Sequence, residues 1–291
     1  MSSPEISVPF QRVAIIGTGL IGGSFALALR EHFPEVKIVG LDRPEIARQA
    51  LARGAVQDIA TDIAGAVRNA DLIYVALPIS GILDALSAIA AHAKPTALVT
   101  DTGSTKAAIC REAAKHFGRG ARFLGGHPIA GKENSGIEHA DSKLFQRSPY
   151  ALIGASDGGD PRVQAFARII QVMGARAIWC DAEKHDWAVG IASHLPQMLA
   201  VALANVAHEA TDEMGLPLSL AGPGARDMLR LAGSSFGVWR DITHTNSKNI
   251  AGALDQLAQA VDHLRTNLTT KELEQEFRTA NEVYRKLQKR D

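Results

Sequence analysis

The sequence has little of several features that would point to a particular class of protein. Only two of its 291 residues are cysteines, Cys110 and Cys180, and they stand far apart in no metal-binding or redox spacing. We therefore expect reduced thiols, no metal site and a cytoplasmic protein. Residues 1–9 contain no basic segment followed by an apolar one, so no signal peptide is predicted.

The chain also lacks an excess of charge of either sign, because 31 Lys and Arg balance 31 Asp and Glu. This balance argues against nucleic acid or an anionic membrane as a partner, and an anionic ligand would need local cations to hold it. The most apolar stretch, Leu195 to Ala207, is shorter than a membrane span and contains Gln197 and Asn205. A buried helix is therefore expected there rather than a membrane segment.

The chain does have enough residues and enough apolar character for two domains. It contains 291 residues, of which 46% are hydrophobic. Strand and helix patterns alternate up to about residue 180, and no convincing strand pattern follows. The alternation predicts a doubly wound, Rossmann-type α/β domain over residues 1–180, and the rest predicts an all-helical domain over residues 181–291.

The first predicted domain opens with a dinucleotide-binding fingerprint. A β-branched apolar run leads through Gly17-x-Gly19-x-x-Gly22 into an Ala- and Leu-rich helix. In this motif the first glycine permits a turn, the second lets the backbone approach a pyrophosphate, and the third lets the helix pack on the strand. The predicted cofactor-binding residues of this motif are Gly17, Gly19, Leu20, Ile21 and Gly22.

A second strand, Val36 to Asp42, ends in an acidic residue where the fingerprint places its ribose ligand. A carboxylate there favours NAD, because it would repel the 2′-phosphate of NADP. Arg43 lies beside it and could tolerate that phosphate, so NADP remains the less favoured alternative.

Three further predicted strands end in residues that could meet a ligand. They span residues 71–78, 96–101 and 121–125, and ligands of parallel sheets bind beyond the carboxyl ends of the strands. Helix capping is the alternative role for Ser104, and a solvated surface position is the alternative for Lys106. The candidates at these strand ends are Leu77, Pro78, Thr102, Ser104, Lys106 and His127.

His127 lies in the glycine-rich stretch Gly125-Gly126-His127-Pro128, which we interpret as a loop one step beyond the last of these strands. Glycines allow a sharp turn and a close approach, and proline fixes the exit direction. An imidazole with an ordinary pKa near ~6.5 can accept a proton at neutral pH. His127 is therefore the candidate catalytic base, and a role as loop filler is the alternative.

The helical half is dominated by a long apolar helical pattern from Glu183 to Glu213, expected at the centre of the second domain or at a dimer interface. Pro196 interrupts it and predicts a kink that places His194 or Gln197 where a ligand could meet them. A buried histidine with its bonding satisfied is the alternative for His194.

Arg226 and Arg230 are four residues apart on one predicted helix face, a spacing suited to a carboxylate clamp. Because the surrounding residues are apolar, at least one of these arginines is expected to point into a protected site. Solvent exposure is the usual alternative for such a pair.

Together these residues resemble the prephenate/arogenate dehydrogenase family of tyrosine biosynthesis. The shared stretches are Gly17-x-Gly19-x-x-Gly22, Asp101-x-Gly-Ser104, Gly126-His-Pro-x-x-Gly131 with Glu133, Ser193-His-Leu-Pro196, Arg230-x-Ala and Trp239-x-Asp-Ile.

The resemblance implies an NAD(P)-dependent oxidative decarboxylation and a homodimer formed through the helical domain. It implies His127 as the base, Ser104 as its hydroxyl partner and Arg230 as the ligand of a substrate carboxylate. Many prephenate-using relatives have a second histidine where this chain has Gln197, so prephenate and arogenate both stay open as substrates. The remaining predicted substrate-binding residues are Glu133, His194, Gln197 and Arg226.

Two other classes remain as alternatives. A dehydrogenase of β-hydroxy acids would share the two-domain build but would need a lysine base on the long helix, where only Lys184 is available. A non-catalytic dinucleotide sensor would bind NAD and would give no reason for His127, Ser104 and Arg230 to occur together.

Overall fold

The computed structural model describes residues 9–118, 120–131, 135–154 and 159–288. The chain divides into two compact units, which we call the α/β unit (Met1–Trp187 with Ser234–Thr245) and the helical unit (Ala188–Gly233 with Asn246–Asp291). The boundary drawn from the sequence, between residues 180 and 181, lies just before helix α7 (Ala182–Val189).

The α/β unit is built on one eight-stranded sheet with the order β3-β2-β1-β4-β5-β6-β7-β8. All neighbouring strands run parallel except β6 and β7. The doubly wound Rossmann-type fold is confirmed, with one antiparallel pair that the sequence pattern did not predict. The strands are β1 (Arg12–Ile16), β2 (Lys37–Leu41), β3 (Asp58–Ile59), β4 (Leu72–Val75), β5 (Leu98–Asp101), β6 (Arg122–Pro128), β7 (Pro149–Ile153) and β8 (Arg176–Cys180).

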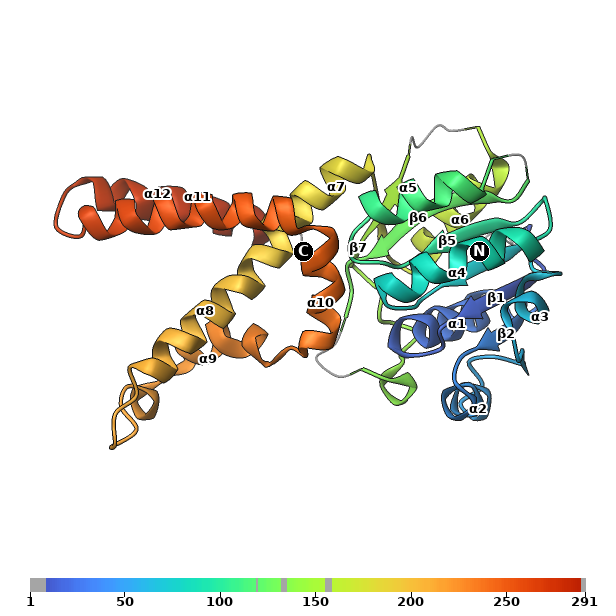
Figure 1. Cartoon of the computed structure of the whole chain (residues 1–291), viewed down its shortest axis with the longest axis horizontal. Coiled ribbons are helices and arrows are strands. Elements are labelled where there is room, and N and C mark those ends of the chain that lie inside the picture. The colour runs from blue at the N-terminus through green and yellow to red at the C-terminus, as the bar shows by residue number, and fades with distance from the viewer. Residues whose placement is uncertain (1–8, 119, 132–134, 155–158, 289–291) are drawn as a thin grey trace, which may run out of the picture. The chain divides into compact units, whose positions relative to one another are not determined.

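Helices cover both faces of this sheet (Figure 1). On one face Phe25 stacks on Tyr74 of β4 with ring centroids 3.8 Å apart, and its ring centroid lies 6.1 Å from that of Phe166. Because both faces are covered, strands such as β4 are wholly buried and apolar. The helices of this unit are α1 (Leu20–His32), α2 (Pro44–Ala52), α3 (Ile63–Val67), α4 (Ile79–His92), α5 (Ala107–His116), η1 (Ile137–His139), α6 (Pro161–Val172), most of α7 and α10 (Phe236–Thr245).

The sixth strand is longer than expected, and this corrects the position of His127. β5 pairs only with Arg122–Leu124, so the second half of β6 passes beyond the carboxyl end of β5. That half pairs antiparallel with β7, and His127 lies opposite Ala151. His127 is therefore part of a strand and not of a glycine-rich loop.

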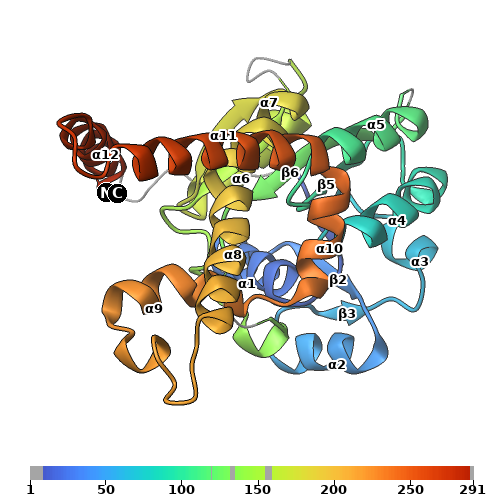
Figure 2. The same ribbon diagram turned by 60° about the vertical axis from the view of Figure 1, so that its left-hand side comes forward.

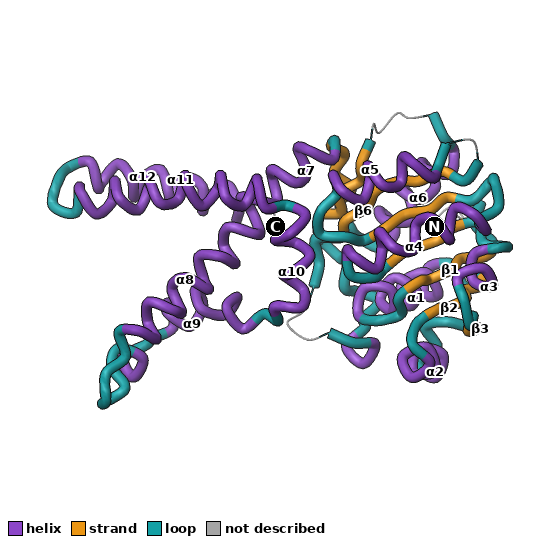
Figure 3. Tube along the Cα trace, in the orientation of Figure 1, coloured by secondary structure: helices purple, strands orange, loops and turns teal. Residues whose placement is uncertain are grey.

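The helical unit contains no strand among its described residues (Figure 3). Helix α12 begins near the end of α11 (Figure 2), and His263 Nε2 of α11 lies 3.5 Å from Glu276 Oε1 of α12. The interruption predicted at Pro196 takes the form of a π-helical turn directly before α8. The elements are η2 (Gly190–His194, π-helical), α8 (Leu195–Glu209), η3 (Leu218–Leu220), α9 (Pro223–Leu229), η4 (Arg230–Gly233), α11 (Ser247–Thr266) and α12 (Glu272–Gln288).

The expectation that the stretch around α8 is buried is wrong for the single chain. Val201, Leu203 and Val206 of α8 are 38%, 37% and 63% exposed. By length and composition alone, the continuous helical stretch Ala182–Glu209 could cross a membrane, and 28% of its most apolar window is buried. An exposed apolar helix of this kind also suits a subunit interface.

Candidate active site

The glycine fingerprint brings together the loops that follow β1 and β4. Gly17 has a positive φ of 90°, and a Cβ there would lie 2.3 Å from the carbonyl oxygen of Ala76. A Cβ on Gly22 would lie 1.9 Å from the carbonyl oxygen of Gly17. Only glycine is compatible with both positions. The two loops meet where the strand order reverses, which is the usual binding crevice of such sheets.

Gly19 differs from Gly17 and Gly22, because a Cβ built on it would have no atom of the described residues within 4 Å. It is the N-cap of α1, whose first residues are Leu20 and Ile21. The first N–H groups of a helix have no partner within the helix and favour a phosphate. This open space at a helix N-terminus fits the pyrophosphate of a dinucleotide.

Asp42 follows directly on β2 and is fixed beside the glycine loop. Its carboxylate accepts hydrogen bonds from the backbone N–H groups of Thr18 and Arg43, both at 2.7 Å. A carboxylate has further acceptor capacity on each oxygen, which suits the hydroxyls of a ribose. The side chain of Arg43 is exposed.

The other predicted cofactor residues lie on the loops after β4 and β5. The Leu77 side chain would lie 3.1 Å from a Cβ on Gly17, and Pro78 is the N-cap of α4. The backbone N–H of Thr102 donates to the carbonyl oxygen of Val75 at 3.1 Å. All three therefore lie at the same edge of the sheet as the glycine loop.

A buried ion pair clamps the residue before His127. Lys106 and Asp101 are fully buried and paired through Lys106 Nζ. Lys106 Nζ also donates to the carbonyl oxygen of Gly126 at 2.7 Å, and Asp101 Oδ1 accepts from the Gly126 N–H at 3.1 Å. The surface position considered for Lys106 is thus wrong, because its charge is satisfied inside the protein.

Gly126 is needed for this clamp, because a Cβ on it would lie 2.7 Å from the carbonyl oxygen of Asp101 and 2.9 Å from Thr100 Oγ1. The backbone of β6 therefore reaches His127 in a fixed position, and the imidazole is half-buried.

The structure adds two residues to the site that the sequence analysis missed, His185 and Asp186 of α7. His127 Nδ1 lies 2.9 Å from His185 Nε2, and His185 Nδ1 lies 2.8 Å from Asp186 Oδ1. The signal was the adjacent pair His185-Asp186, in a segment that we considered only for Lys184. A carboxylate that accepts a hydrogen bond from a histidine ring holds that ring in one orientation at many catalytic sites.

Ser104 lies in the bend between β5 and α5, and the two ends of this segment, Asp101 and Lys106, both bond to Gly126. Among the described residues its hydroxyl makes no hydrogen bond that would cap α5, whose N-cap residue is Lys106. Ser104 therefore stays a candidate partner of His127. Glu133 lies outside the described residues.

In the helical unit two predicted residues are buried. His194 is 1% exposed, and its Nδ1 lies 3.1 Å from Asn246 Nδ2. Gln197 is 3% exposed and donates from Nε2 to the carbonyl oxygen of Leu231 at 2.9 Å. The contact of His194 agrees with the alternative that it is a buried histidine whose hydrogen bonding is satisfied. The contact of Gln197 holds its side chain against the backbone next to Arg230.

Arg226 and Arg230 are both exposed in the single chain, contrary to the expectation of a protected site. Helix α9 ends at Leu229, and Arg230 begins a 3-10 segment, so the two arginines do not share one regular helix. A 3-10 turn changes the spacing on which the predicted clamp depended.

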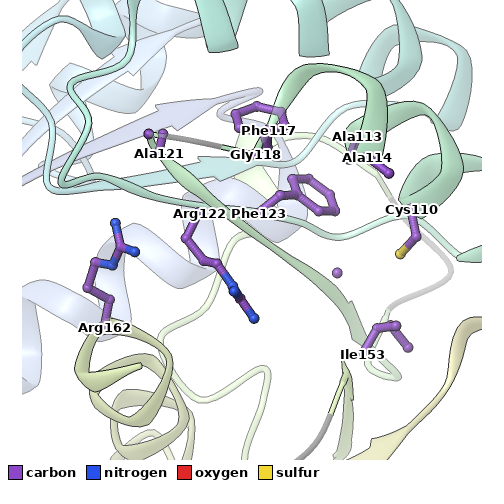
Figure 4. Close-up of a pocket in the computed structure, with 12 residues that line it drawn as sticks. Cys110, Ala113, Ala114, Phe117, Gly118, Ala121, Arg122, Phe123, Ile153 and Arg162 are labelled. Carbon is purple, nitrogen blue, oxygen red and sulfur yellow. The ribbon is translucent and has the colours of Figure 1, made fainter. Parts of the chain in front are cut away.

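A cavity of about 370 Å³ lies beside α5 and β6 of the α/β unit. Figure 4 shows Arg122 and Arg162 on its wall with Phe123 and Cys110. Burial raises the pKa of the Cys110 thiol to about 12, so this thiol is protonated at neutral pH. None of the predicted site residues that the structure describes lines this cavity.

Comparisons with known proteins agree with this geometry. A family model for the nucleotide-binding domain of prephenate dehydrogenase matches residues 25–179, and one for its dimerization domain matches residues 181–282. Prephenate dehydrogenase of Lactococcus lactis is 33% identical over 90% of this chain and 72% of its own length. Cyclohexadienyl dehydrogenase of Zymomonas mobilis is 29% identical over 90% of both chains.

Solved structures resemble both units. Prephenate dehydrogenase from A. aeolicus, in complex with hydroxyphenyl propionate and NAD+, has a TM-score of 0.87 at 28% identity and covers 98% of this chain and 100% of its own. Arogenate dehydrogenase from Synechocystis has a TM-score of 0.81 at 29% identity, covering 95% of this chain and 99% of its own. With a glycine cradle at the reversal point of the sheet and an imidazole on β6, the chain belongs to the prephenate dehydrogenase family.

Proposed function

We propose that this chain catalyses the NAD-dependent oxidative decarboxylation of prephenate, arogenate or both, as a step of tyrosine biosynthesis. The observation that supports this most directly is the pairing of an open dinucleotide cradle at Gly19 with a half-buried imidazole, His127. The Nδ1 atom of that imidazole is hydrogen-bonded to a buried side chain, His185. Names of the related proteins point to the same reaction.

The substrate of such a reaction is a 4-hydroxycyclohexadienyl carboxylic acid. A nicotinamide dinucleotide, bound at the cradle formed by Gly17, Gly19 and Gly22, supplies the acceptor for the hydride that leaves C4. His127 accepts the proton of the C4 hydroxyl as the carbonyl forms. The electron pair of the C1–carboxylate bond then enters the ring and carbon dioxide leaves. The ring becomes aromatic, and the proton returns from His127 to the phenol oxygen.

His127 is the proposed base because its backbone is fixed and its side chain is accessible. The ion pair of Asp101 and Lys106 holds the preceding peptide group from both sides. Fixing a proton acceptor in place removes most of the entropy cost of bringing it to the substrate. Ser104, on the segment between Asp101 and Lys106, is the proposed hydroxyl partner of the base.

NAD is the proposed cofactor in preference to NADP. The Asp42 carboxylate is fixed by two backbone N–H groups and places a negative charge where the 2′-phosphate of NADP would lie. Arg43 is exposed next to it and is the residue that would reduce this discrimination.

Arg230 is the proposed ligand of a substrate carboxylate, because a guanidinium binds a carboxylate in a bidentate way. Gln197 is bonded to the backbone of Leu231, the next residue, and so holds the segment that contains Arg230. Gln197 and the segment around Arg230 are the proposed determinants of whether the enzyme prefers prephenate, a keto acid, or arogenate, an amino acid.

The alternative of a β-hydroxy acid dehydrogenase receives no support from Lys184. Its side chain is 80% exposed and paired with Asp181 at 3.2 Å, where it is a surface ion pair and not a base. The 3-hydroxyisobutyrate dehydrogenase of Mycobacterium tuberculosis shares the fold, with a TM-score of 0.56 at 16% identity.

A homodimer formed through the helical unit belongs to the same proposal. Residues 181–282 match a dimerization domain, and α8 and α12 leave apolar side chains exposed. We also place the protein in the cytoplasm, in keeping with its two free cysteines.

The proposal is tested by measuring nucleotide reduction and carbon dioxide release with prephenate and with arogenate, each with NAD and with NADP. We expect both products in equal amounts with at least one substrate, and a higher kcat/KM with NAD. If the protein binds NAD but turns over neither substrate, the proposed reaction is wrong and the non-catalytic dinucleotide sensor is the better interpretation.

Replacing the proposed base separates binding from chemistry. His127→Asn keeps a polar side chain of similar reach and should bind NAD as the wild type does. We expect kcat to fall by about 10²- to 10⁴-fold, the usual contribution of general-base catalysis. Steady-state kinetics with NAD titration checks this, and a kcat near the wild-type value would remove His127 as the base.

A further inference from the structure

Three side chains form a linear hydrogen-bonded chain that ends at the proposed base. His127 Nδ1 lies 2.9 Å from His185 Nε2, and His185 Nδ1 lies 2.8 Å from Asp186 Oδ1. The two rings meet edge to face at 70°, with their centroids 5.1 Å apart. His185 and Asp186 are 3% and 2% exposed, so water does not compete for these bonds.

The far end of this chain can only accept hydrogen bonds. The Asp186 carboxylate accepts from the backbone N–H of Lys106 at 2.6 Å and from that of Ala107 at 2.9 Å. These N–H groups are at the N-terminus of α5, where the helix dipole favours an ionised carboxylate. An ionised carboxylate has no hydrogen to donate. The hydrogen shared by Asp186 and His185 therefore belongs to Nδ1 of His185.

The position of the hydrogen on His185 then determines which ring nitrogen of His127 is protonated. A neutral histidine with its hydrogen on Nδ1 has a lone pair on Nε2. His185 Nε2 must therefore accept, and His127 Nδ1 must carry the hydrogen that it accepts. The lone pair of neutral His127 is left on Nε2, which is the nitrogen that His185 does not contact.

We propose that His185 and Asp186 are positioning residues that hold His127 in the Nδ1–H tautomer, with Nε2 ready to accept the hydroxyl proton of the substrate. The catalytic part of this inference depends on the proposed function, whereas the tautomer does not. When Nε2 takes up the proton, His127 becomes an imidazolium whose Nδ1–H still donates to His185. The Asp186 carboxylate at the other end of the chain stabilises that charge, and the proton returns from Nε2 to the product.

The tautomer is measurable in the wild-type protein without any substrate. Nitrogen-15 NMR of histidine-labelled protein distinguishes a protonated ring nitrogen from an unprotonated one, and His127→Asn identifies the signals that belong to His127. We expect Nδ1 of His127 to be protonated and Nε2 to be unprotonated at neutral pH. The opposite assignment would overturn the proposal, even if the enzyme turns out to act on another substrate.

Asp186→Asn should invert this arrangement. The asparagine amide can donate to His185 Nδ1, which moves the hydrogen of His185 to Nε2 and makes that nitrogen a donor. His127 Nδ1 must then accept, and its own hydrogen moves to Nε2. We expect the NMR signals of His127 to exchange their character and kcat to fall, and unchanged signals in the folded variant would contradict the proposal.

Two substitutions of His185 separate positioning from packing. His185→Leu removes the acceptor of the His127 hydrogen, whereas the side-chain oxygen of His185→Gln can still accept it. We expect kcat of the leucine variant to fall by about 10- to 10²-fold, less than loss of the base itself. KM and the Kd for NAD should stay within about twofold, because ground-state binding is not changed.

The glutamine variant should recover much of the lost kcat. A leucine variant with wild-type kcat, or a glutamine variant as slow as the leucine variant, would show that His185 has only a structural role. Lys184→Ala is the matched control, because it removes an exposed ion pair from the same helix, and its kcat should equal that of the wild type. If the leucine variant does not fold, the NMR result on the wild type still decides.

Discussion

At the scale of single residues, the three glycines of the fingerprint have different physical reasons to be glycine. Gly17 and Gly22 are fixed by contacts within the protein, since a Cβ on either would overlap a backbone oxygen. Gly19 faces open space, so none of the described residues requires glycine there. We expect a bound dinucleotide to be the reason for glycine at position 19, so stability and binding can be separated there.

Gly19→Ala should therefore weaken NAD binding and leave the fold intact. We expect the Kd for NAD to rise by about tenfold or more, which corresponds to about 1.4 kcal/mol, with little change in Tm. Gly22→Ala is the matched comparison and should cost about 1 to 3 kcal/mol of stability or more, because its Cβ would lie 1.9 Å from a backbone oxygen. Calorimetry and thermal unfolding measure the two effects, and equal loss of Tm in both variants would contradict this reading.

At the scale of elements, the parallel part of the sheet could be predicted from the sequence, because apolar runs alternate with helical patterns. The antiparallel pairing of β6 with β7 could not, because the pattern of one strand does not indicate the direction of its partner. The two glycines Gly125 and Gly126 predict a loop, but both lie in β6 and pair with β7. Gly126 instead allows β6 to pass close to the carbonyl oxygen of Asp101.

The candidate site, like the sheet, could be predicted from the sequence only in part. His127 and the nucleotide motif are short-range patterns, whereas the bond from His127 to His185 joins residues 58 positions apart. Lys106 and Asp101 each look like a charged loop residue, and only the fold reveals that they neutralise each other inside the protein. The sequence could not predict contacts of this kind.

The opposite edge of the sheet offers a prediction for the element scale. Asp71, just before β4, accepts from the N–H groups of Gln11 and Arg12, both at 2.8 Å, and pairs with Lys94. Burial opposes ionisation of Asp71, but these hydrogen bonds outweigh it and lower its pKa below the ordinary value of 3.8. A lowered pKa stabilises the fold above the pKa of the unfolded chain, and the stabilisation is lost as pH falls through the folded value.

Asp71→Asn should thus cost about 1 to 3 kcal/mol at neutral pH, the range for hydrogen bonds to a charged group. As pH falls through the lowered pKa of Asp71, the difference between variant and wild type should shrink, because the wild-type carboxyl becomes protonated. Urea unfolding at several pH values measures this difference. A difference that stayed constant over this range would contradict the role of the charge.

At the scale of the whole molecule, one chain leaves a large apolar surface on its helical unit. Phe277, Tyr284 and Leu287 of α12 are 63%, 62% and 58% exposed, and no residue of α12 is buried. Val206 of α8 is 63% exposed. Apolar side chains in such number at one end of a chain are typical of a surface that a second subunit covers.

Phe277→Glu should therefore shift the protein toward monomers. We expect a wild-type Tm that rises with protein concentration and a variant with lower Tm and little concentration dependence. Sedimentation analysis measures the mass directly. Leu51→Glu is the control, because Leu51 is 42% exposed on α2 of the α/β unit and should leave the mass unchanged. A variant that sediments as the wild type does would exclude α12 from the interface.

Helix α10 belongs to the α/β unit although it follows much of the helical unit in the chain. The carboxylate of Asp241 on α10 accepts from the backbone N–H of Ser80 at 2.9 Å, and Thr105 Oγ1 lies 2.7 Å from Thr245 Oγ1. During synthesis Asp241 and Thr245 leave the ribosome long after the strands of the sheet. Although nascent chains tend to fold from the N-terminus onward, this unit reaches its final contacts only once residues 234–245 have emerged.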